Sequence, residues 1–262
     1  MKPLSILDLF AMKQRGEKIS CLTAYDASFS SMLDKIGIDI ILVGDSLGMV
    51  IQGYDTTLPV TINDMVYHTL CVSRARQRAY IIADLPFMSY PTPVIAAKNA
   101  AKLIQSGGAQ MVKLEGPKID TISFLVDQGI PVCGHLGLLP QSINQIGSYK
   151  VQGKEKAAAD KMLVDAMQLQ QAGASMLVLE CVPKSLAKEI CAQLTIPVIG
   201  IGAGVDCDGQ VLVLYDMLNI GSAKRPRFSK NFMNNASNIE EAIQAYHQAV
   251  KHSQFPMDIH SF

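Results

Sequence analysis

Short runs that are apolar at every position recur along the chain, and they limit the folds that it can adopt. Ile40-Ile41-Leu42-Val43 and Met176-Leu177-Val178-Leu179 are two clear examples. A strand with one face in water alternates apolar and polar residues, whereas a strand that is covered on both faces does not. These runs therefore predict parallel strands that are covered by helices.

Strand patterns and helix patterns follow one another along most of the 262 residues. We expect strands at Ile19–Ala24, Ile38–Val43, Tyr80–Ala83, Gln110–Leu114, Pro131–Gly134, Met176–Leu179, Pro197–Ile201 and Val211–Tyr215. Between them we expect helices at Ser28–Ile36, Asn63–Ala75, Pro93–Ser106, Ile119–Gln128, Glu155–Ala172 and Lys184–Gln193. Gly37, Gly107, Gly129 and Gly173 follow four of these helices, at the position where a glycine commonly ends a helix.

Strands in this number can close an α/β barrel of the (β/α)8 TIM type, or they can form an open doubly wound sheet. We favour the barrel, because polar residues follow many of the strands. Such residues can encircle the mouth of a barrel, whereas an open sheet has its site at the one point where the strand order reverses. The whole chain, 1–262, is then one catalytic domain. An extra N-terminal helix, Ser5–Arg15, is expected at the bottom of the barrel, and a helix near Ile239–His252 is expected to close the ring.

Composition argues against several classes of partner. Lys+Arg and Asp+Glu are both 23, so the chain lacks the excess of basic residues with which proteins bind nucleic acid or anionic membranes. No apolar run is long enough to span a bilayer, and no secretion signal is apparent. The six cysteines show no Cys-x-x-Cys spacing, which is typical of reduced thiols in a cytoplasmic protein. The low charged fraction, 18%, indicates burial against other subunits of a homo-oligomer.

Ionisable residues stand at the ends of the second to the sixth expected strands. They are Asp45 (followed by Ser46), Asp84, Lys113 with Glu115, His135 and Glu180. Active sites of such barrels lie at the carboxyl ends of the strands. A single aspartate there is more often a helix cap or a turn residue, but carboxylates that gather at one mouth repel one another unless a cation or a proton intervenes. The pattern therefore predicts an active site.

Asp45, Asp84 and Glu115 are hard oxygen ligands without clustered thiolates or a histidine pair. This favours Mg²⁺ over Zn²⁺. Because Mg²⁺ commonly keeps several waters, we expect one or two of these carboxylates to bind it directly. The alternative for Asp84 is a turn cap before Pro86.

Lys113 and Glu115 are two residues apart on a strand, so their side chains point to the same side. A buried lysine needs a partner, which is either a ligand carboxylate or the carboxylate of a substrate.

His135 lies near two glycines that would let a ligand approach the backbone; the alternative is a histidine hydrogen-bonded to a carbonyl. Glu180 follows four apolar residues, and partial burial there would suit a general base.

A series of short segments, in the same order along the chain, resembles the ketopantoate hydroxymethyltransferase family. The segments are Thr23-Ala24-Tyr25-Asp26, Val43-Gly44-Asp45-Ser46-Leu47-Gly48-Met49, Thr57-Leu58-Pro59-Val60-Thr61, Ala83-Asp84-Leu85-Pro86-Phe87, Val112-Lys113-Leu114-Glu115-Gly116, Pro131-Val132-Cys133-Gly134-His135-Leu136-Gly137, Tyr149-Lys150-Val151-Gln152-Gly153, Leu179-Glu180-Cys181-Val182-Pro183 and Ile199-Gly200-Ile201-Gly202-Ala203-Gly204.

The resemblance implies a (β/α)8 barrel that transfers a hydroxymethyl group from 5,10-methylenetetrahydrofolate to 3-methyl-2-oxobutanoate. The product, 2-dehydropantoate, serves pantothenate and coenzyme A synthesis, and such enzymes use Mg²⁺ and assemble as decamers. The resemblance also implies roles for residues. Asp45, Asp84 and Glu115 would belong to the metal site; Asp45, Ser46, Asp84 and Lys113 would contact the oxo acid; Glu180 would accept the proton; and His135 stands at the family's active-site histidine.

Three alternatives stay open at this point. A Mg-dependent carbon–carbon lyase of the isocitrate-lyase or phosphoenolpyruvate-mutase type would share the barrel and the enolate chemistry. A buried Lys113 would also allow Schiff-base chemistry. A barrel that serves only for binding or assembly would not need the acidic strand ends.

Overall fold

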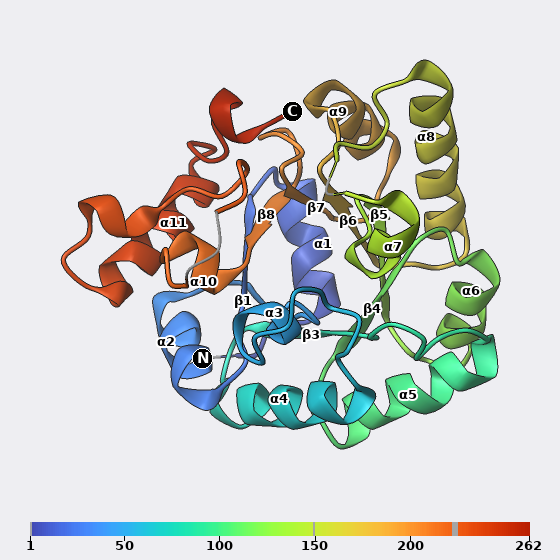
Figure 1. Cartoon of the computed structure of the whole chain (residues 1–262), viewed down its shortest axis with the longest axis horizontal. Helices are drawn as coiled ribbons and strands as arrows, with labels where there is room; N and C mark the ends of the chain where they lie inside the picture. Colours follow the sequence, from blue (N-terminus) through green and yellow to red (C-terminus); the bar gives the residue numbers. More distant parts are fainter. Residues whose placement is uncertain (1, 149, 222–224) are drawn as a thin grey trace.

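The computed structural model describes residues 2–148, 150–221 and 225–262, and Tyr149 of the segments quoted above lies outside them. Eight parallel strands form a closed barrel in sequence order, which confirms the (β/α)8 barrel and rules out the open sheet (Figure 1). The strands are β1 Ile19–Thr23, β2 Ile40–Val43, β3 Tyr80–Asp84, β4 Met111–Glu115, β5 Val132–Gly137, β6 Met176–Glu180, β7 Val198–Ile201 and β8 Gly209–Leu212.

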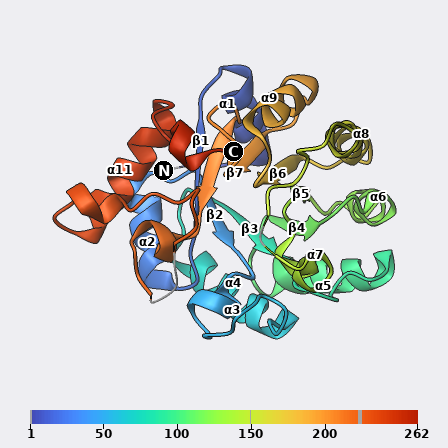
Figure 2. The same cartoon turned by 45° about the horizontal axis from the view of Figure 1, so that its top comes forward.

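Helices form a ring around the strands (Figure 2). The α-helices are α1 Ile6–Gln14, α2 Ala27–Ile36, α3 Leu47–Val50, α4 Ile62–Ala75, α5 Pro93–Gln105, α6 Ile119–Asp127, α7 Ile143–Ile146, α8 Lys156–Gln171, α9 Lys184–Gln193, α10 Leu214–Met217 and α11 Ile239–Lys251. The helices expected from the sequence are all present, and their bounds differ by at most one residue at either end. The four-residue helices α3, α7 and α10 were not predicted, because so few residues show no periodicity.

The glycine prediction was wrong at one helix end. Gly37, Gly129 and Gly173 have positive φ angles of 99°, 79° and 96°, as expected for residues that end helices. After α5, however, the positive φ belongs to Gly108, at 82°, and not to Gly107. A side chain at Gly107 would instead meet the carbonyl oxygen of Leu103 at 2.6 Å, so this glycine is required by close packing.

The last strand was predicted two residues too late. The sequence pattern indicated Val211–Tyr215, but β8 begins at Gly209, and Leu214 already starts α10. Gly209 has no apolar side chain to mark a strand. A Cβ atom there would lie 2.4 Å from the carbonyl oxygen of Ile19, so glycine is needed for β8 to pair with β1.

Several strands run further than predicted at their carboxyl ends. Asp84 is the last residue of β3, Glu115 the last of β4 and Glu180 the last of β6, and His135 lies inside β5. The backbone of each of these residues therefore belongs to a strand of the barrel and not to a connecting loop.

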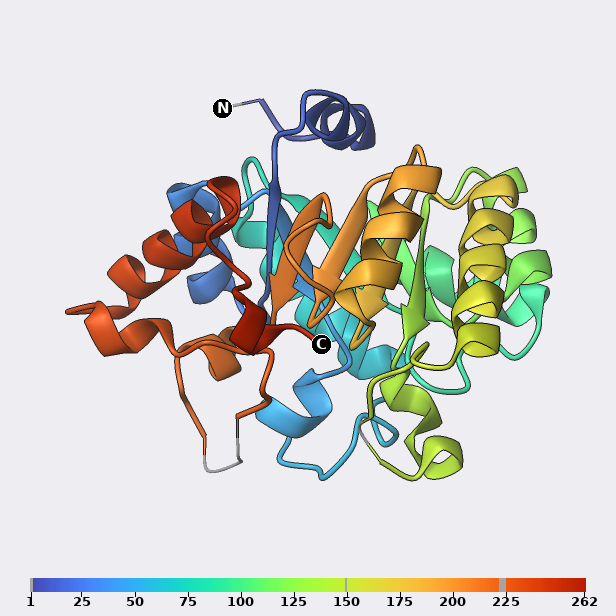
Figure 3. The same cartoon turned by 90° about the horizontal axis from the view of Figure 1, so that it is seen from above.

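Helix α1 lies across the end of the barrel where the strands begin (Figure 3). The backbone N–H of Leu4 donates to the carbonyl oxygen of Arg78, just before β3, and Lys13 Nζ lies 2.6 Å from Asp208 Oδ2, just before β8. This confirms the extra N-terminal helix and its predicted place at the barrel bottom. In the described part of the chain, no helix is long and apolar enough to cross a membrane.

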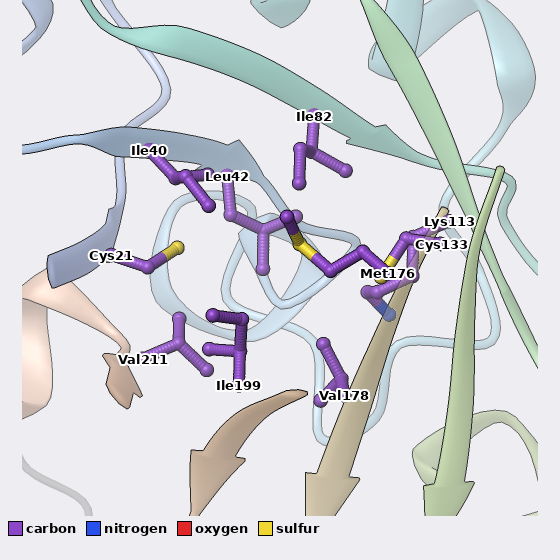
Figure 4. A pocket seen from close by; sticks show the side chains of 10 residues that line it. All are labelled: Cys21, Ile40, Leu42, Ile82, Lys113, Cys133, Met176, Val178, Ile199 and Val211. Atoms are coloured by element: carbon purple, nitrogen blue, oxygen red, sulfur yellow. The ribbon is translucent and has the colours of Figure 1, made fainter. Parts of the chain in front are cut away.

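The inside of the barrel is filled by apolar side chains from the strands (Figure 4). They surround a cavity of about 10 Å³, which is about the smallest space that holds one water. Lys113 is the one charged residue in its lining, and the other lining residues are Cys21, Ile40, Leu42, Ile82, Cys133, Met176, Val178, Ile199 and Val211. This apolar layer lies inside the barrel, below the residues at the carboxyl ends of the strands.

Candidate active site

The residues predicted from the sequence lie together at the carboxyl ends of β2 to β6. Asp45 and Ser46 follow β2, whereas the other predicted residues, Asp84, Lys113, Glu115, His135 and Glu180, belong to the strands themselves. Asp45, Asp84, Lys113, Glu115 and His135 are buried, with at most 5% of each residue exposed. Ser46 and Glu180 are half-buried at the edge of the group.

A hydrogen bond links Asp45, which follows β2, to Asp84 at the end of the neighbouring strand β3. The backbone N–H of Asp45 donates to Asp84 Oδ2 at 3.1 Å. Gly44 permits this approach, since a Cβ atom there would lie 2.8 Å from Ser46 Oγ and 3.5 Å from Asp84 Oδ2. Asp84, Asp45 and Ser46 therefore share one small region of the mouth.

Lys113 pairs with the end of the neighbouring strand. Its Nζ lies 3.1 Å from Asp84 Oδ1, and the two residues are register partners in the β3–β4 ladder. Burial alone would lower the pKa of Lys113, but the surrounding carboxylates, Asp84 foremost, raise it above its usual value. Of the two partners that the sequence allowed for this lysine, the structure contains the ion pair with a carboxylate.

His135 lies between Lys113 and Glu180. Nδ1 is 3.4 Å from Lys113 Nζ, and Nε2 is 3.4 Å from Glu180 Oε2. Burial, and then the charge of Lys113, lowers the pKa of His135 well below its usual value, so the ring is neutral at pH 7. Because the ammonium group can only donate, we assign the acceptor lone pair to Nδ1 and the proton to Nε2, facing Glu180.

Burial shifts the carboxyl groups of the mouth toward their protonated forms. It raises the pKa of Asp45 to about 7, with a further contribution from the charge of Asp84. It also raises the pKa of Glu180 to about 7, and that of Glu115 well above its usual value. A carboxylate that titrates near neutral pH suits a general base, and crowded carboxylates suit a cation site.

The glycines near His135 accommodate protein and not ligand, which corrects the sequence-based interpretation. A Cβ atom at Gly134 would lie 3.1 Å from Cδ1 of Leu169 on α8. At Gly137, where φ is +97°, it would lie 2.1 Å from the carbonyl oxygen of Glu180. Gly137 thus lets β5 pair with β6 at the level of Glu180.

Two further residues reach the site without having been assigned a role from the sequence. The hydroxyl group of Tyr25, which is buried just after β1, lies 2.9 Å from Ser46 Oγ. Gln141 donates from Nε2 to Asp45 Oδ2 at 2.8 Å and from its backbone N–H to Glu115 Oε2 at 3.0 Å. A glutamine within the apolar turn after β5 was the one available signal for this second residue.

The acidic side chains fit a Mg²⁺ ion by their chemistry. Asp45, Asp84 and Glu115 offer carboxylate oxygens, and buried Asp84 Oδ1 makes no hydrogen bond, although the Lys113 ammonium lies beside it. Among the described residues, however, no three His, Cys, Asp or Glu side chains are already spaced as a metal site. Lys113 and Gln141 contact all three carboxylates instead: Lys113 pairs with Asp84, and Gln141 donates to Asp45 and Glu115.

Solved structures with the same fold match this chain at low sequence identity. A putative phosphonomutase from Burkholderia cenocepacia J2315 matches with a TM-score of 0.63 and 15% identity, over 82% of this chain and 95% of its own. Phosphonopyruvate hydrolase, solved with oxalate and Mg²⁺, matches with a TM-score of 0.60 and 12% identity, over 79% and 80%. Identities this low show the barrel fold alone.

Curated relatives match at far higher identity and over nearly their whole length. The 3-methyl-2-oxobutanoate hydroxymethyltransferase of Methylococcus capsulatus is 57% identical over 99% of this chain and 97% of its own. The enzyme of that name from Nitrosococcus oceani is 57% identical over 98% of both chains. The family model described as ketopantoate hydroxymethyltransferase matches residues 3–258. The chain therefore belongs to the ketopantoate hydroxymethyltransferase family.

Proposed function

We propose that the acidic mouth of the barrel is the catalytic centre of this enzyme, a 3-methyl-2-oxobutanoate hydroxymethyltransferase of pantothenate biosynthesis. The observation that best supports the site is that Asp84, Lys113 and Glu180 lie around the same mouth of the barrel. Lys113 pairs with Asp84, and its charge acts on Glu180. The co-substrate that this reaction implies is 5,10-methylenetetrahydrofolate. Residues 1–262 would act as one catalytic domain.

The first step would be removal of the proton from C3 of the oxo acid. Glu180 would accept it, because its pKa of about 7 leaves part of the population ionised and still basic near neutral pH. His135 Nε2 lies 3.4 Å from Glu180 Oε2 without a hydrogen bond, so the neutral ring would be the neighbour of the base on the side of Lys113. Asp45 and Ser46, at the opposite side of the mouth, would contact the oxo acid.

The negative charge that develops on the substrate needs a fixed positive charge nearby. Lys113 provides it from a buried position, and the ion pair with Asp84 holds the ammonium group in place. Charge stabilisation in a water-poor site is worth far more than in water. The additional acidity of C3 comes from the Lewis acidity of Mg²⁺ when Asp45, Asp84 and Glu115 hold it, directly or through water.

The rival chemistries receive less support. Likeness to mutases and hydrolases is confined to the fold, whereas the relatives at 57% identity are hydroxymethyltransferases. Schiff-base formation needs an unprotonated lysine, but its carboxylate neighbours raise the pKa of Lys113. A barrel without catalysis leaves the buried carboxylates unexplained.

A coupled assay separates these possibilities. Purified enzyme is incubated with 3-methyl-2-oxobutanoate and 5,10-methylenetetrahydrofolate, and formation of 2-dehydropantoate is followed with Mg²⁺, with EDTA and with EDTA followed by excess Mg²⁺. We expect turnover that EDTA abolishes and Mg²⁺ restores. Turnover that survives EDTA, together with borohydride trapping of the oxo acid on Lys113, would support the Schiff base instead.

We also propose that the chain forms a homo-oligomer, a decamer by analogy with its family, and that it works in the cytoplasm. Four large apolar residues near the start of α5 are exposed: Phe87 by 44%, Met88 by 64%, Val94 by 54% and Ile95 by 41%. Such a group supports a contact with another subunit. All six cysteines are free, which supports a reducing compartment.

A further inference from the structure

We infer that Gln141 is a positioning residue that holds two carboxylates of the proposed metal site, Asp45 and Glu115, at a fixed separation. The inference rests on the function proposed above. Gln141 lies in the short 3-10 turn Pro140–Ser142, which follows β5 and precedes α7. It is only 6% exposed, so its polar groups need partners inside the protein.

Gln141 reaches both carboxylates through different groups. Its side-chain Nε2 donates to Asp45 Oδ2 at 2.8 Å and to the carbonyl oxygen of Leu85 at 3.0 Å. Its backbone N–H donates to Glu115 Oε2 at 3.0 Å. One residue from the β5–α8 connection thus links the end of β2 to the end of β4, with β3 between them.

Tyr90 fixes which way the amide group of Gln141 points. The Tyr90 hydroxyl donates to Gln141 Oε1 and accepts from the backbone N–H of Glu115 at 3.4 Å. If the amide were turned over, Oε1 would face the carboxylate of Asp45 and the carbonyl of Leu85, which are both acceptors. The hydrogen bonds therefore run in one direction, from Glu115 through Tyr90 and Gln141 to Asp45.

This arrangement matters because two acidic side chains lie in a buried place, where they repel each other when both are ionised unless a cation intervenes. Hydrogen-bond partners behind metal-binding carboxylates orient them, and their loss commonly weakens metal binding. Gln141 bonds one oxygen of each carboxylate, Oδ2 of Asp45 and Oε2 of Glu115, and does not bond the other oxygen of either. Glu115 Oε1 lies 3.7 Å from His135 Nδ1. A residue that served only to fill the turn would not need to bond both.

The test measures the affinity of the protein for Mn²⁺, used as a paramagnetic probe of the Mg²⁺ site, by electron paramagnetic resonance without substrate. Gln141→Met keeps the side-chain length and the backbone N–H but removes the amide. We expect it to weaken Mn²⁺ binding about 10–100-fold, the usual cost of losing such a partner. Gln145→Met is the matched control, because Gln145 is an exposed glutamine in α7 of the same connection, and its Mn²⁺ affinity should equal that of the wild type.

Steady-state kinetics add a second readout. Gln141→Met should raise the KM for Mg²⁺ about as much as it weakens Mn²⁺ binding, while kcat at saturating Mg²⁺ falls less. Equal Mn²⁺ affinity in wild type and Gln141→Met would overturn the inference. Should Gln141→Met fail to fold, Tyr90→Phe decides: it frees the amide to turn over, so its Mn²⁺ affinity should fall at least about threefold, and an unchanged affinity would overturn the inference as well.

Failure of the metal site itself would give a different result. Asp84→Ala removes a proposed ligand and should abolish tight Mn²⁺ binding. If Asp84→Ala binds Mn²⁺ as well as the wild type does, the proposed metal site is wrong, and the role of Gln141 falls with it. If Asp84→Ala loses binding and Gln141→Met does not, only the role of Gln141 is wrong.

Discussion

At the scale of residues, the mouth is a set of mutually dependent charges. Lys113 is paired with Asp84, and its charge helps to keep His135 neutral. Nε2 of the neutral His135 ring in turn lies 3.4 Å from Glu180 Oε2. Each group therefore has a protonation state that its neighbours influence. Glu180, the proposed general base, lies at the half-buried edge of the group.

Replacing the base tests this assignment. Glu180→Gln keeps the shape of the side chain but cannot accept the C3 proton. We expect exchange of that proton in D₂O, followed by NMR on the oxo acid alone, to slow about 10²–10⁴-fold, the usual contribution of a general base. Glu189→Gln, in an exposed position of α9, is the control and should exchange normally. Normal exchange in Glu180→Gln would move the base to another residue.

The pH dependence of the same exchange follows from the pKa of Glu180. Burial raises that pKa to about 7, so the basic form is lost as the pH falls through 7. Below that value the exchange rate should fall about tenfold for each pH unit, and above pH 8 it should level off. The measurement is a rate profile from pH 5.5 to 8.5 in saturating Mg²⁺. A flat profile over this range would contradict the assignment.

At the scale of elements, the strand ends place the site and the glycines allow the strands to approach. Gly137 is the clearest case, because its positive φ and its contact with the Glu180 carbonyl both require glycine. Gly129 has a similar φ, +79°, but open space around it. Substitutions at these two positions therefore distinguish the free-energy cost of the positive φ angle alone from the cost of the same angle together with a steric clash.

Gly129→Ala and Gly137→Ala should differ in stability. Placing alanine at positive φ costs about 1 kcal/mol, and this is the loss that we expect for Gly129→Ala. Gly137→Ala adds the clash and should lose more than about 3 kcal/mol of the free energy of unfolding. Urea denaturation of both variants measures this. Equal losses would mean that β5 and β6 can shift apart without cost, contrary to the register at Glu180.

Local signals in the sequence explain why the helices could be predicted so closely. Asp26, Thr61, Thr92 and Asn238 each accept a hydrogen bond from the first turn of the following helix, and such caps are visible in the sequence. The start of β8 could not be predicted, because Gly209 is explained only by its contact with Ile19. Gln141 likewise shows its importance only when β2 and β4 are placed beside it in space.

At the scale of the whole molecule, the two ends of the barrel have different tasks. Helix α1 and its Lys13–Asp208 ion pair cover the end where the strands begin, while α3 and α7 lie at the other end, with the mouth (Figure 3). The apolar layer inside the barrel separates the two ends (Figure 4). The exposed apolar residues near the start of α5 belong to the segment that connects β3, which ends at Asp84 of the site, with α5 and to the first turn of that helix.

The proposed assembly can be tested with two matched substitutions. Val94→Glu places a charge in the exposed apolar group near α5, and Val164→Glu places the same charge on α8, where the valine is similarly exposed at 51%. In light scattering coupled to gel filtration, the wild type and Val164→Glu should elute as decamers, and Val94→Glu as smaller species. A wild type that elutes as a single chain would refute the assembly, and an intact Val94→Glu decamer would place the contact elsewhere.

The most direct test of the account is a crystal structure of the enzyme with Mg²⁺ and 3-methyl-2-oxobutanoate. We expect an octahedral ion among Asp45, Asp84 and Glu115, with one or two carboxylate oxygens at about 2.0–2.1 Å and waters or the oxo acid in the other positions. Lys113 should contact the oxo acid, and Glu180 should face C3. An ion bound away from these carboxylates, or an oxo acid whose C3 is out of reach of Glu180, would contradict the account.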